Sequence, residues 1–347
     1  MHAPDTASSL PCWDPWILKV NGRYQLFFLT GSIDQDPWWK TSWICGGYSE
    51  DMRHWQHTGA VLEPLPNNGW ESGRLFAGSA HHQQGTSYLF YSAASEADIT
   101  HETIGVATAG ENGLWQRSSQ PLLSFEEATA VRTASGIGYA GRCRWSNHLH
   151  WRDPYFFKAE KSYLFFCASL TTPGQPAGSD SARFQGGLGV AVADSPAGPY
   201  TVLPPAAGPG IVEASLWPFY HLERPQVIYF NHKYHLFFSC FKAFINPLWL
   251  EQIGEHTVTD STLYWYVSDH LTGPFYPSSD RPVVPGSDAT ELYGTTFFPL
   301  GTQPCDSTAN KLELAVLGWY TKTYRLAIAQ EFKAFWHAND LKIVPNS

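Results

Sequence analysis

Methionine and charged residues are scarce in this chain of 347 residues. It holds 2 methionines, and charged residues make up only 15 % of it. Long runs of alanine, leucine, glutamate and lysine are also few, which leaves little material for helices. Apolar residues reach 43 %, with 15 Trp, 17 Tyr and 21 Phe. Because aromatic and β-branched residues favour strands, the composition predicts an all-β protein with an extensive core.

Positive charge is also in short supply. The chain has 22 Lys and Arg against 31 Asp and Glu, a net charge of −9. A negative surface repels phosphate backbones, so we expect no nucleic-acid partner. No apolar run approaches the ~20 residues that span a bilayer, so we expect no membrane partner. Residues 1–10 hold neither a basic segment nor an apolar run, which favours a cytoplasmic protein, or a secreted one whose leader has been removed.

Metal-binding motifs are absent. The six cysteines form no CxxC motif and no Cys/His cluster, and histidines such as His81, His82 and His148 lack ligand spacing. We therefore expect no metal and no other cofactor. Cys167 and Cys240 stand within apolar runs, which predicts buried thiols. The spacing assigns no disulfide pair.

A strand, a short turn and a second strand recur five times along the chain. The first turn is Asn21-Gly22, a strong two-residue hairpin signal because both residues tolerate positive φ. The fourth copy turns at Asn231-His232 in the same register. The copies cover residues 15–29, 78–91, 154–166, 225–238 and 295–317.

Each copy is followed by a strand of small and apolar residues that leads to an aromatic residue. Two hairpins per copy make a four-stranded antiparallel sheet, and five such sheets arranged radially make a five-bladed β-propeller. No composition break divides the chain, so we predict a single domain over residues 1–347. These second patterns cover residues 44–55, 104–115, 188–200, 264–275 and 326–336.

Long insertions separate some of the repeats. Ordered loops on a rigid scaffold usually carry binding specificity. The aromatic residues Phe219, Tyr220 and Trp249 lie in these insertions, where they either line the rim of a binding site or plug the core. The longest insertions cover residues 124–151, 171–185, 203–221 and 241–262.

Three of the inner hairpins begin with an acidic residue close to a proline. Each acid stands 13 to 15 residues before the last phenylalanine of its hairpin. We therefore predict that Asp14, Asp153 and Glu223 lie in matched register at the mouth of one central channel. The motifs are Trp13-Asp14-Pro15, Arg152-Asp153-Pro154 and Glu223-Arg224-Pro225.

These acids point to acid/base chemistry. A buried carboxylate is costly unless it is paired, hydrogen-bonded or functional. Three that converge repel one another and raise the pKa of at least one, as glycoside hydrolysis requires of its acid. The alternative, that each acid only caps a turn, does not explain three in matched register. Arg152 and Arg224 either orient carboxylates and substrate hydroxyls or form structural ion pairs.

These motifs resemble glycoside hydrolase family 68, the levansucrase, inulosucrase and bacterial invertase group, which shares a clan with family 32. The resemblance spans roughly residues 12–320 and includes residues 76–80, 222–225, 266–268 and 271–274. It implies a five-bladed propeller that cleaves or transfers β-fructofuranosyl groups with retention, through a fructosyl-enzyme intermediate. Sucrose or a related β-fructoside would be the substrate, and water or a sugar the acceptor.

The resemblance also implies roles for individual residues. Asp14 would be the nucleophile and Glu223 the general acid/base, about 5 to 6 Å apart as retention demands. Asp153 would bind fructosyl hydroxyls and stabilise the oxocarbenium-like transition state. The residues implied to bind substrate are Trp13, Arg152 and Arg224, with Ser79 and Tyr293 nearby.

The chain departs from the family pattern on the leaving-group side. His221 stands two positions before the acid/base, where the family commonly has an acid; we count it among the substrate-binding candidates. Phe241-Lys242 lies where a basic residue usually follows the hairpin, and Phe76-Ala77 replaces Trp-Ser. We therefore expect intact fructosyl chemistry with an altered leaving-group or acceptor preference, and hydrolysis over long polymer synthesis.

Two other functions remain open. One is an arabinofuranosidase or arabinanase of the related family 43, against which the Glu-Arg-Pro motif argues. The other is a sugar-binding propeller without catalytic turnover, which the presence of all three acids disfavours.

Overall fold

The computed structural model describes residues 11–32, 38–110, 113–143, 145–173, 183–211, 216–300 and 311–346. Residues 1–10, to which the expectation about a leader refers, and Cys305 lie outside the described residues. So does part of the insertion at 171–185. None of the described helices is long and apolar enough to cross a membrane.

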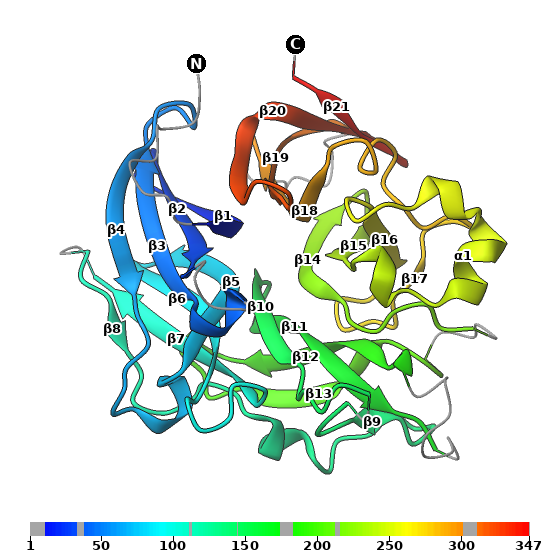
Figure 1. Ribbon diagram of the computed structural model, residues 1–347, viewed down its shortest axis with the longest axis horizontal. Coiled ribbons are helices and arrows are strands. Elements are labelled where there is room, and N and C mark those ends of the chain that lie inside the picture. The colour runs from blue at the N-terminus through cyan, green and yellow to red at the C-terminus, as the bar shows by residue number, and fades with distance from the viewer. Residues whose placement is uncertain are drawn as a thin grey trace.

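Five antiparallel sheets stand around a central axis, and their innermost strands are β1, β5, β10, β14 and β18 (Figure 1). The predicted five-bladed β-propeller with four-stranded blades is confirmed. Blade one holds β1 (Cys12–Val20), β2 (Arg23–Thr30), β3 (Trp43–Ser49) and β4 (Gln56–Leu62). Blade two holds β5 (Arg74–Gln83), β6 (Thr86–Ala94), β7 (Glu102–Ala109) and β8 (Gln116–Arg117).

The remaining three blades follow the same order of strands. Blade three holds β10 (Trp151–Lys158), β11 (Ser162–Thr171), β12 (Gly186–Ala193) and β13 (Thr201–Ala207), with the short β9 (Gly138–Tyr139) paired to β11. Blade four holds β14 (Glu223–Phe230), β15 (Lys233–Ser239), β16 (Leu263–Ser268) and β17 (Tyr276–Pro277). Blade five holds β18 (Leu292–Pro299), β19 (Lys311–Tyr320), β20 (Arg325–His337) and β21 (Asp340–Pro345).

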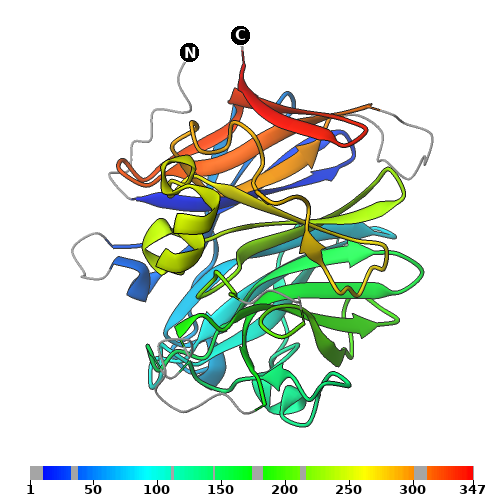
Figure 2. The same ribbon diagram turned by 90° about the vertical axis from the view of Figure 1, so that its right-hand side faces the viewer.

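Blade five closes the ring against blade one. The backbone N–H of Cys12 donates to the carbonyl oxygen of Tyr324 at 2.9 Å. The innermost strands β1 and β18 lie side by side in both views (Figures 1 and 2). Among the described residues, each strand of the first and last blades pairs only within its own blade.

The two predicted tight turns have the backbone that their residues favour. Asn21 and Gly22 have φ of 51° and 84°, and Asn231 and His232 have φ of 48° and 61°. Two successive positive φ values are the mark of a type I′ turn, whose twist matches that of the flanking strands. Both turn predictions are confirmed.

The second pattern is confirmed in four blades and differs in the fifth. Its final aromatic residue directly precedes the outermost strand in blades one to four. Trp336 instead lies inside β20, because this strand continues for 13 residues before the chain turns. The four aromatic residues before outer strands are Trp55, Trp115, Tyr200 and Phe275.

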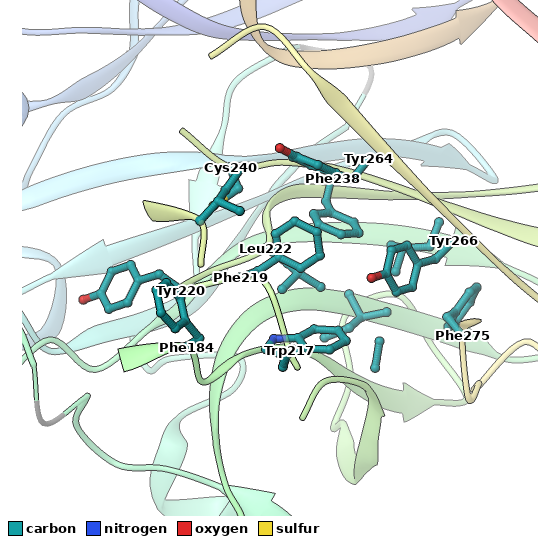
Figure 3. Close-up of a cluster of buried hydrophobic side chains, with 14 of the residues drawn as sticks. Phe184, Trp217, Phe219, Tyr220, Leu222, Phe238, Cys240, Tyr264, Tyr266 and Phe275 are labelled. Atoms are coloured by element: carbon teal, nitrogen blue, oxygen red, sulfur yellow. The ribbon is translucent and has the colours of Figure 1, made fainter. Parts of the chain in front are cut away.

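The insertions around blade four fill the core beside it. Phe219 is completely buried, and its ring lies 4.6 Å from that of Tyr264 and 4.9 Å from that of Phe238 (Figure 3). Trp249, on α1 (Pro247–Ile253), packs on the other side of Phe219. Both residues therefore plug the core and do not line a rim. Tyr220 differs, since its hydroxyl points out of this cluster (Figure 3).

The described cysteines carry free thiols. Cys167 and Cys240 are fully buried, as predicted. Burial raises the pKa of both thiols, which keeps them protonated and unreactive.

Candidate active site

A β-bulge interrupts the inner strand at the same level in blades one, three, four and five. In blade one, for example, Trp13 pairs with Leu29 and the next pair is Trp16 with Phe27. The matching shifts lie between Arg152 and Tyr155, Glu223 and Gln226, and Tyr293 and Thr296. The residue after the first of each pair has positive φ; these residues are Asp14 (47°), Asp153 (56°), Arg224 (53°) and Gly294 (60°).

The bulges correct the predicted register. Asp14 and Asp153 are equivalent, but Glu223 stands one position earlier, level with Arg152. Arg224, and not Glu223, is the counterpart of the two aspartates. The spacing of 13 to 15 residues from the last phenylalanine allowed this slip, whereas the prolines show it, because Asp14 and Asp153 directly precede proline and Glu223 stands two residues before Pro225.

The bulge explains how neighbouring side chains reach one site. In a regular strand, successive side chains point to opposite faces. A bulge re-aims a side chain, so that Arg152 and Asp153 both contact residues of blade four. Positive φ at a non-glycine residue costs about 1 kcal/mol or more and collects at functional sites. Three such residues at one level of the ring mark this level as the candidate active site.

Glu223 is engaged by two blades. Arg152 Nη2 donates to Glu223 Oε1 at 2.7 Å, and the Tyr293 hydroxyl donates to Oε2. His221 Nε2 lies 3.4 Å from the same Oε2. The Tyr293 ring is itself fixed by stacking on Phe241, with ring centroids 3.7 Å apart. The carboxylate is therefore held in one orientation.

Asp153 faces the same group of residues. Its Oδ2 accepts the backbone N–H of Arg224 at 3.0 Å and lies 3.9 Å from Arg152 Nε. Its own backbone N–H donates to the Ser92 hydroxyl at 3.2 Å. Blade three thus presents one carboxyl to blade four, with the charge of Arg152 beside it.

Asp14 is held from blade five. Trp319 Nε1 donates to its Oδ1 at 3.0 Å. A Cβ at Gly294 would lie only 2.5 Å from that oxygen. Gly294 therefore leaves the space that the Asp14 carboxyl occupies.

The Arg224 side chain links neighbouring inner strands of the ring. Its guanidinium donates to the carbonyl oxygens of Gly78 at 3.1 Å and Pro15 at 3.0 Å. One arginine of blade four thereby binds blades one and two. Beyond it, the inner strands enclose a cavity of about 700 Å³, and its described lining includes Arg224 but no carboxylate. The three carboxyls therefore do not line this cavity.

The three carboxyls influence one another electrostatically. Burial, reinforced by the charge of Glu223, raises the pKa of Asp14 to about 6. Burial, together with the charges of Asp14 and Glu223, raises the pKa of Asp153 to about 7. The expectation that convergence raises at least one pKa is confirmed.

Glu223 responds in the opposite direction. Burial alone would raise its pKa, but the charges of His221 and Arg152 and the hydrogen bond from Tyr293 outweigh burial and lower the pKa to about 2. Burial also lowers the pKa of His221 to about 4. The imidazole is then neutral near pH 7, which leaves Arg152 as the cation that keeps Glu223 ionised. As the pH rises, Glu223 therefore loses its proton first, and Asp14 and Asp153 lose theirs later.

Two other predicted residues pack between blades. Trp13 is buried in the core between blades one and two, next to Leu75 and Ala77. The Ser79 hydroxyl donates to the carbonyl oxygen of Pro154 at 2.8 Å and accepts the backbone N–H of Phe156 at 2.9 Å. Ser79 therefore links blades two and three, and the structure does not bring it together with the acids.

Sequence reasoning missed three residues that shape the site. Trp319 and Gly294 hold and accommodate Asp14, and Glu102 binds Arg152 at 3.0 Å. An alignment of Tyr293-Gly294-Thr295 with Trp13-Asp14-Pro15 was the available signal for Gly294. Nothing in the sequence distinguishes Trp319 or Glu102 from other strand residues. Within the described part of the chain, no three His, Cys, Asp or Glu side chains gather in a group that could hold a metal.

Parts of this chain are similar in sequence to known proteins. The family model for the glycosyl hydrolases family 32 N-terminal domain matches residues 14–176, which include Asp14 and Asp153. A levansucrase from Rahnella aquatilis is 23 % identical over 275 residues, 73 % of this chain. The match spans only 60 % of the length of that relative.

Solved structures share the fold. The inulosucrase from Halalkalicoccus jeotgali bound to kestose has a TM-score of 0.72 at 22 % identity, over 98 % of this chain and 88 % of that one. Bacillus subtilis levansucrase has a TM-score of 0.71 at 17 % identity, over 100 % of this chain and 89 % of that one. Together with the sequence matches, they confirm the predicted resemblance of this chain to the clan of glycoside hydrolase families 32 and 68.

Proposed function

We propose that this chain is a retaining β-fructofuranosidase and fructosyltransferase that acts on sucrose or a related β-fructoside. The observation that carries the proposal is the meeting of Asp14, Asp153 and Glu223 at one level of the ring, from three different blades. The charge of Glu223 raises the pKa of both aspartates, and that of Asp14 raises the pKa of Asp153, which supports a shared site. The named relatives, a levansucrase and an inulosucrase bound to kestose, support a fructosyl substrate.

The first step forms a fructosyl-enzyme. Asp14 attacks the anomeric carbon of the fructosyl group with one carboxylate oxygen, and the glycosidic bond breaks. Glu223 gives its proton to the departing oxygen, so the leaving sugar departs as a neutral alcohol. Because Trp319 holds Oδ1 of Asp14, we assign the attack to Oδ2. Asp153 binds the fructosyl hydroxyls and stabilises the positive charge that develops on the ring.

The second step releases the fructosyl group. Glu223, now ionised, takes a proton from water or from an acceptor hydroxyl, whose oxygen attacks the same carbon from the face that the leaving group vacated. The bond to Asp14 breaks and the carboxylate is restored. Two inversions give net retention. This proposal includes a distance of about 5 to 6 Å between the carboxyl groups of Asp14 and Glu223.

The proton must move before the first step. In the free site Glu223 is ionised because Arg152 faces it, whereas an acid must carry a proton. A bound sugar excludes water from Glu223, and an ionised Asp14 beside it favours the protonated form. We propose that substrate binding raises the pKa of Glu223 and that Asp14, with a pKa of about 6, is ionised in the working enzyme.

Incubation with sucrose and chromatography of the products tests this function. Equal glucose and fructose indicates hydrolysis, which we expect to dominate because His221, Phe241 and Phe76 depart from the family pattern on the acceptor side. Excess glucose indicates transfer to sugars. Absence of fructose from sucrose and other β-fructosides, or release of arabinose from arabinosides instead, would refute the proposal.

Two variants test the roles. We expect Asp14→Asn and Glu223→Gln each to lower kcat by about three orders of magnitude or more, with circular dichroism close to wild type. Glu223→Gln should also lower Tm, because it leaves the buried Arg152 without one of its carboxylate partners. Asp269→Asn is the control, since its carboxyl is a partner of Lys233 at the surface. Near-normal turnover in either active-site variant would exclude the role assigned to that residue.

A further inference from the structure

Four side chains of alternating charge connect blade two to the candidate acid/base. Arg74 Nη2 lies 3.4 Å from Glu102 Oε1, and Glu102 Oε2 lies 3.0 Å from Arg152 Nη1. Arg152 Nη2 in turn donates to Glu223 Oε1 at 2.7 Å. The series starts on β5 and β7, crosses β10 and ends on β14.

Glu102 is the least accessible carboxylate of this series. Its residue is only 3 % exposed, and it also accepts the backbone N–H of Trp151 at 3.1 Å. Arg152 is likewise buried and has both carboxylates as partners. Removal of one partner from a buried ion pair leaves an uncompensated charge, which is costly and changes the field at its neighbours.

The geometry points to Glu102 as a positioning residue that holds Arg152 in place and limits the positive charge that Glu223 faces. This inference rests on the proposed function, because it concerns the working of Glu223 as the acid. Glu102 binds Arg152, and it acts on Glu223 through Arg152 and through His221, whose pKa its charge raises. Arg152 can serve Glu223 as a fixed donor because its other nitrogen is occupied by Glu102.

The remaining groups around Glu223 stay in place when Glu102 is changed. They come from the strands β1, β10, β11 and β18 and from residues that flank β10, β14 and β15. They are Asp14 on β1, Asp153 on β10, Cys167 on β11, Tyr293 on β18, Cys240 after β15, His221 two residues before β14, and His150, whose Nδ1 contacts Arg152 Nη1. Because Glu102 also raises the pKa of His221, a change in the ionisation of Glu223 in a Glu102 variant passes through Arg152 and His221.

Changes at Glu102 and at Arg74 should shift the pKa of Glu223 in opposite directions. In Glu102→Gln the full charge of Arg152 acts on Glu223, so the acid loses its proton at lower pH. In Arg74→Met the charge of Glu102 is shared with Arg152 alone, so Arg152 attracts Glu223 less and the acid loses its proton at higher pH. A purely structural role would not produce shifts of opposite sign.

The experiment is the pH profile of kcat for sucrose, whose basic limb reports loss of the proton from the acid in the substrate complex. For Glu102→Gln we expect this limb to move down by about one pH unit and kcat at pH 7 to fall about tenfold. For Arg74→Met we expect the limb to move up. Glu102→Asp, which keeps the charge, restores part of the wild-type profile.

Glu71→Gln is a matched control in the same blade. Glu71 is also fully buried, and it is paired with Arg117 at 3.1 Å and with the Tyr91 hydroxyl at 2.7 Å. We expect it to lower Tm as Glu102→Gln does, but to leave both limbs of the profile unchanged. The comparison separates loss of a buried ion pair from loss of this connection to the site.

The inference is overturned if folded Glu102→Gln keeps the wild-type basic limb or moves it upward. Should this variant not fold, Arg74→Met and Glu102→Asp decide in its place, and an unmoved limb in Arg74→Met overturns the inference. Full turnover by Glu223→Gln would instead refute the proposed function. If Glu223→Gln is inactive and the limb of Glu102→Gln does not move, only the role of Glu102 fails.

Discussion

Gly294 on blade five has no side chain at the point where the Asp14 carboxyl of blade one lies. A methyl group there would stand 2.5 Å from Asp14 Oδ1, well inside contact distance. We expect Gly294→Ala to displace the carboxylate and to lower kcat by about 100-fold, because misplacement of about 1 Å has that effect on an attacking group. Steady-state kinetics with sucrose measures it.

Gly22→Ala is the matched control for this change. Gly22 also has positive φ, at 84°, but no atom lies within 4 Å of its added Cβ. Both variants incur the backbone strain of about 1 kcal/mol, and only Gly294→Ala should lose turnover. Equal turnover in the two variants would show that Gly294 serves the backbone alone.

Asp153 should make stability depend on pH. Its folded pKa of about 7 lies above the ordinary aspartate value of 3.8, so between about pH 4 and 7 the folded state binds more protons than the unfolded state. Its contribution is therefore full at low pH and is lost as pH rises through 7. We expect Asp153→Asn to raise the free energy of unfolding by about 1 to 3 kcal/mol at pH 8 and by little at pH 4.

Denaturant unfolding at the two pH values tests this sign. Asp269→Asn, a change at an exposed carboxyl, should alter stability by less than about 0.5 kcal/mol at both. A gain for Asp153→Asn that is larger at pH 4 than at pH 8 would mean that the buried carboxyl is stabilised as an anion.

The side chains of the site differ in how visible they are in the sequence. Asp14, Asp153 and Glu223 stand out because a repeated motif places an acid beside proline. Tyr293 is implied only by the family resemblance. Trp319 and Glu102 carry no local signal, since their roles arise from contacts between blades that lie far apart in the sequence. Contacts of this kind depend on the packing of the whole ring.

At the scale of elements, the turn residues predicted the hairpins and the hydrophobic patterns predicted the strands. Asn21-Gly22 and Asn231-His232 identify their turns because few residues adopt two successive positive φ values. The register of the acids was wrong by one position at Glu223, since counting back from the last phenylalanine overlooked that Arg224 separates this acid from its proline. Element type was thus predictable, and the direction of the side chains at the bulge was not.

The fourth hairpin offers a test of this turn chemistry. His232 holds φ at 61° with a bulky side chain, where the first hairpin has glycine. We expect His232→Gly to raise the free energy of unfolding by about 0.5 to 1 kcal/mol, because glycine adopts this conformation without strain. Denaturant unfolding measures the gain. A loss of stability would show that the His232 side chain makes a contact that outweighs its backbone strain.

At the scale of the whole molecule, polar side chains pin neighbouring inner strands together. Gln226 of blade four donates to the carbonyl oxygen of Phe297 at 2.7 Å and accepts its N–H at 2.8 Å, which joins blade four to blade five. Ser79 joins blades two and three in the same way. The ring that carries the carboxyls is therefore fixed by a few buried hydrogen bonds.

Loss of one pin should weaken the ring. We expect Gln226→Leu to lower the free energy of unfolding by about 2 to 4 kcal/mol, because it leaves both backbone groups of Phe297 without their partner. Gln226→Glu keeps an oxygen that can accept the N–H of Phe297. With its carboxyl protonated in the folded state, this variant should lower the free energy of unfolding by less than Gln226→Leu does. Unchanged stability in Gln226→Leu would show that the blades are held by apolar packing alone.

The central claim is that Asp14 carries the fructosyl group between two steps that Glu223 serves. Its most direct test is mass spectrometry of Glu223→Gln after incubation with β-fructosyl fluoride, whose leaving group needs no acid. The second step lacks its base in this variant, so a fructosyl adduct should accumulate on the peptide that contains Asp14 and should be absent in Asp14→Asn/Glu223→Gln. An adduct on another carboxyl, or rapid turnover to inverted fructose with no adduct, would contradict the account.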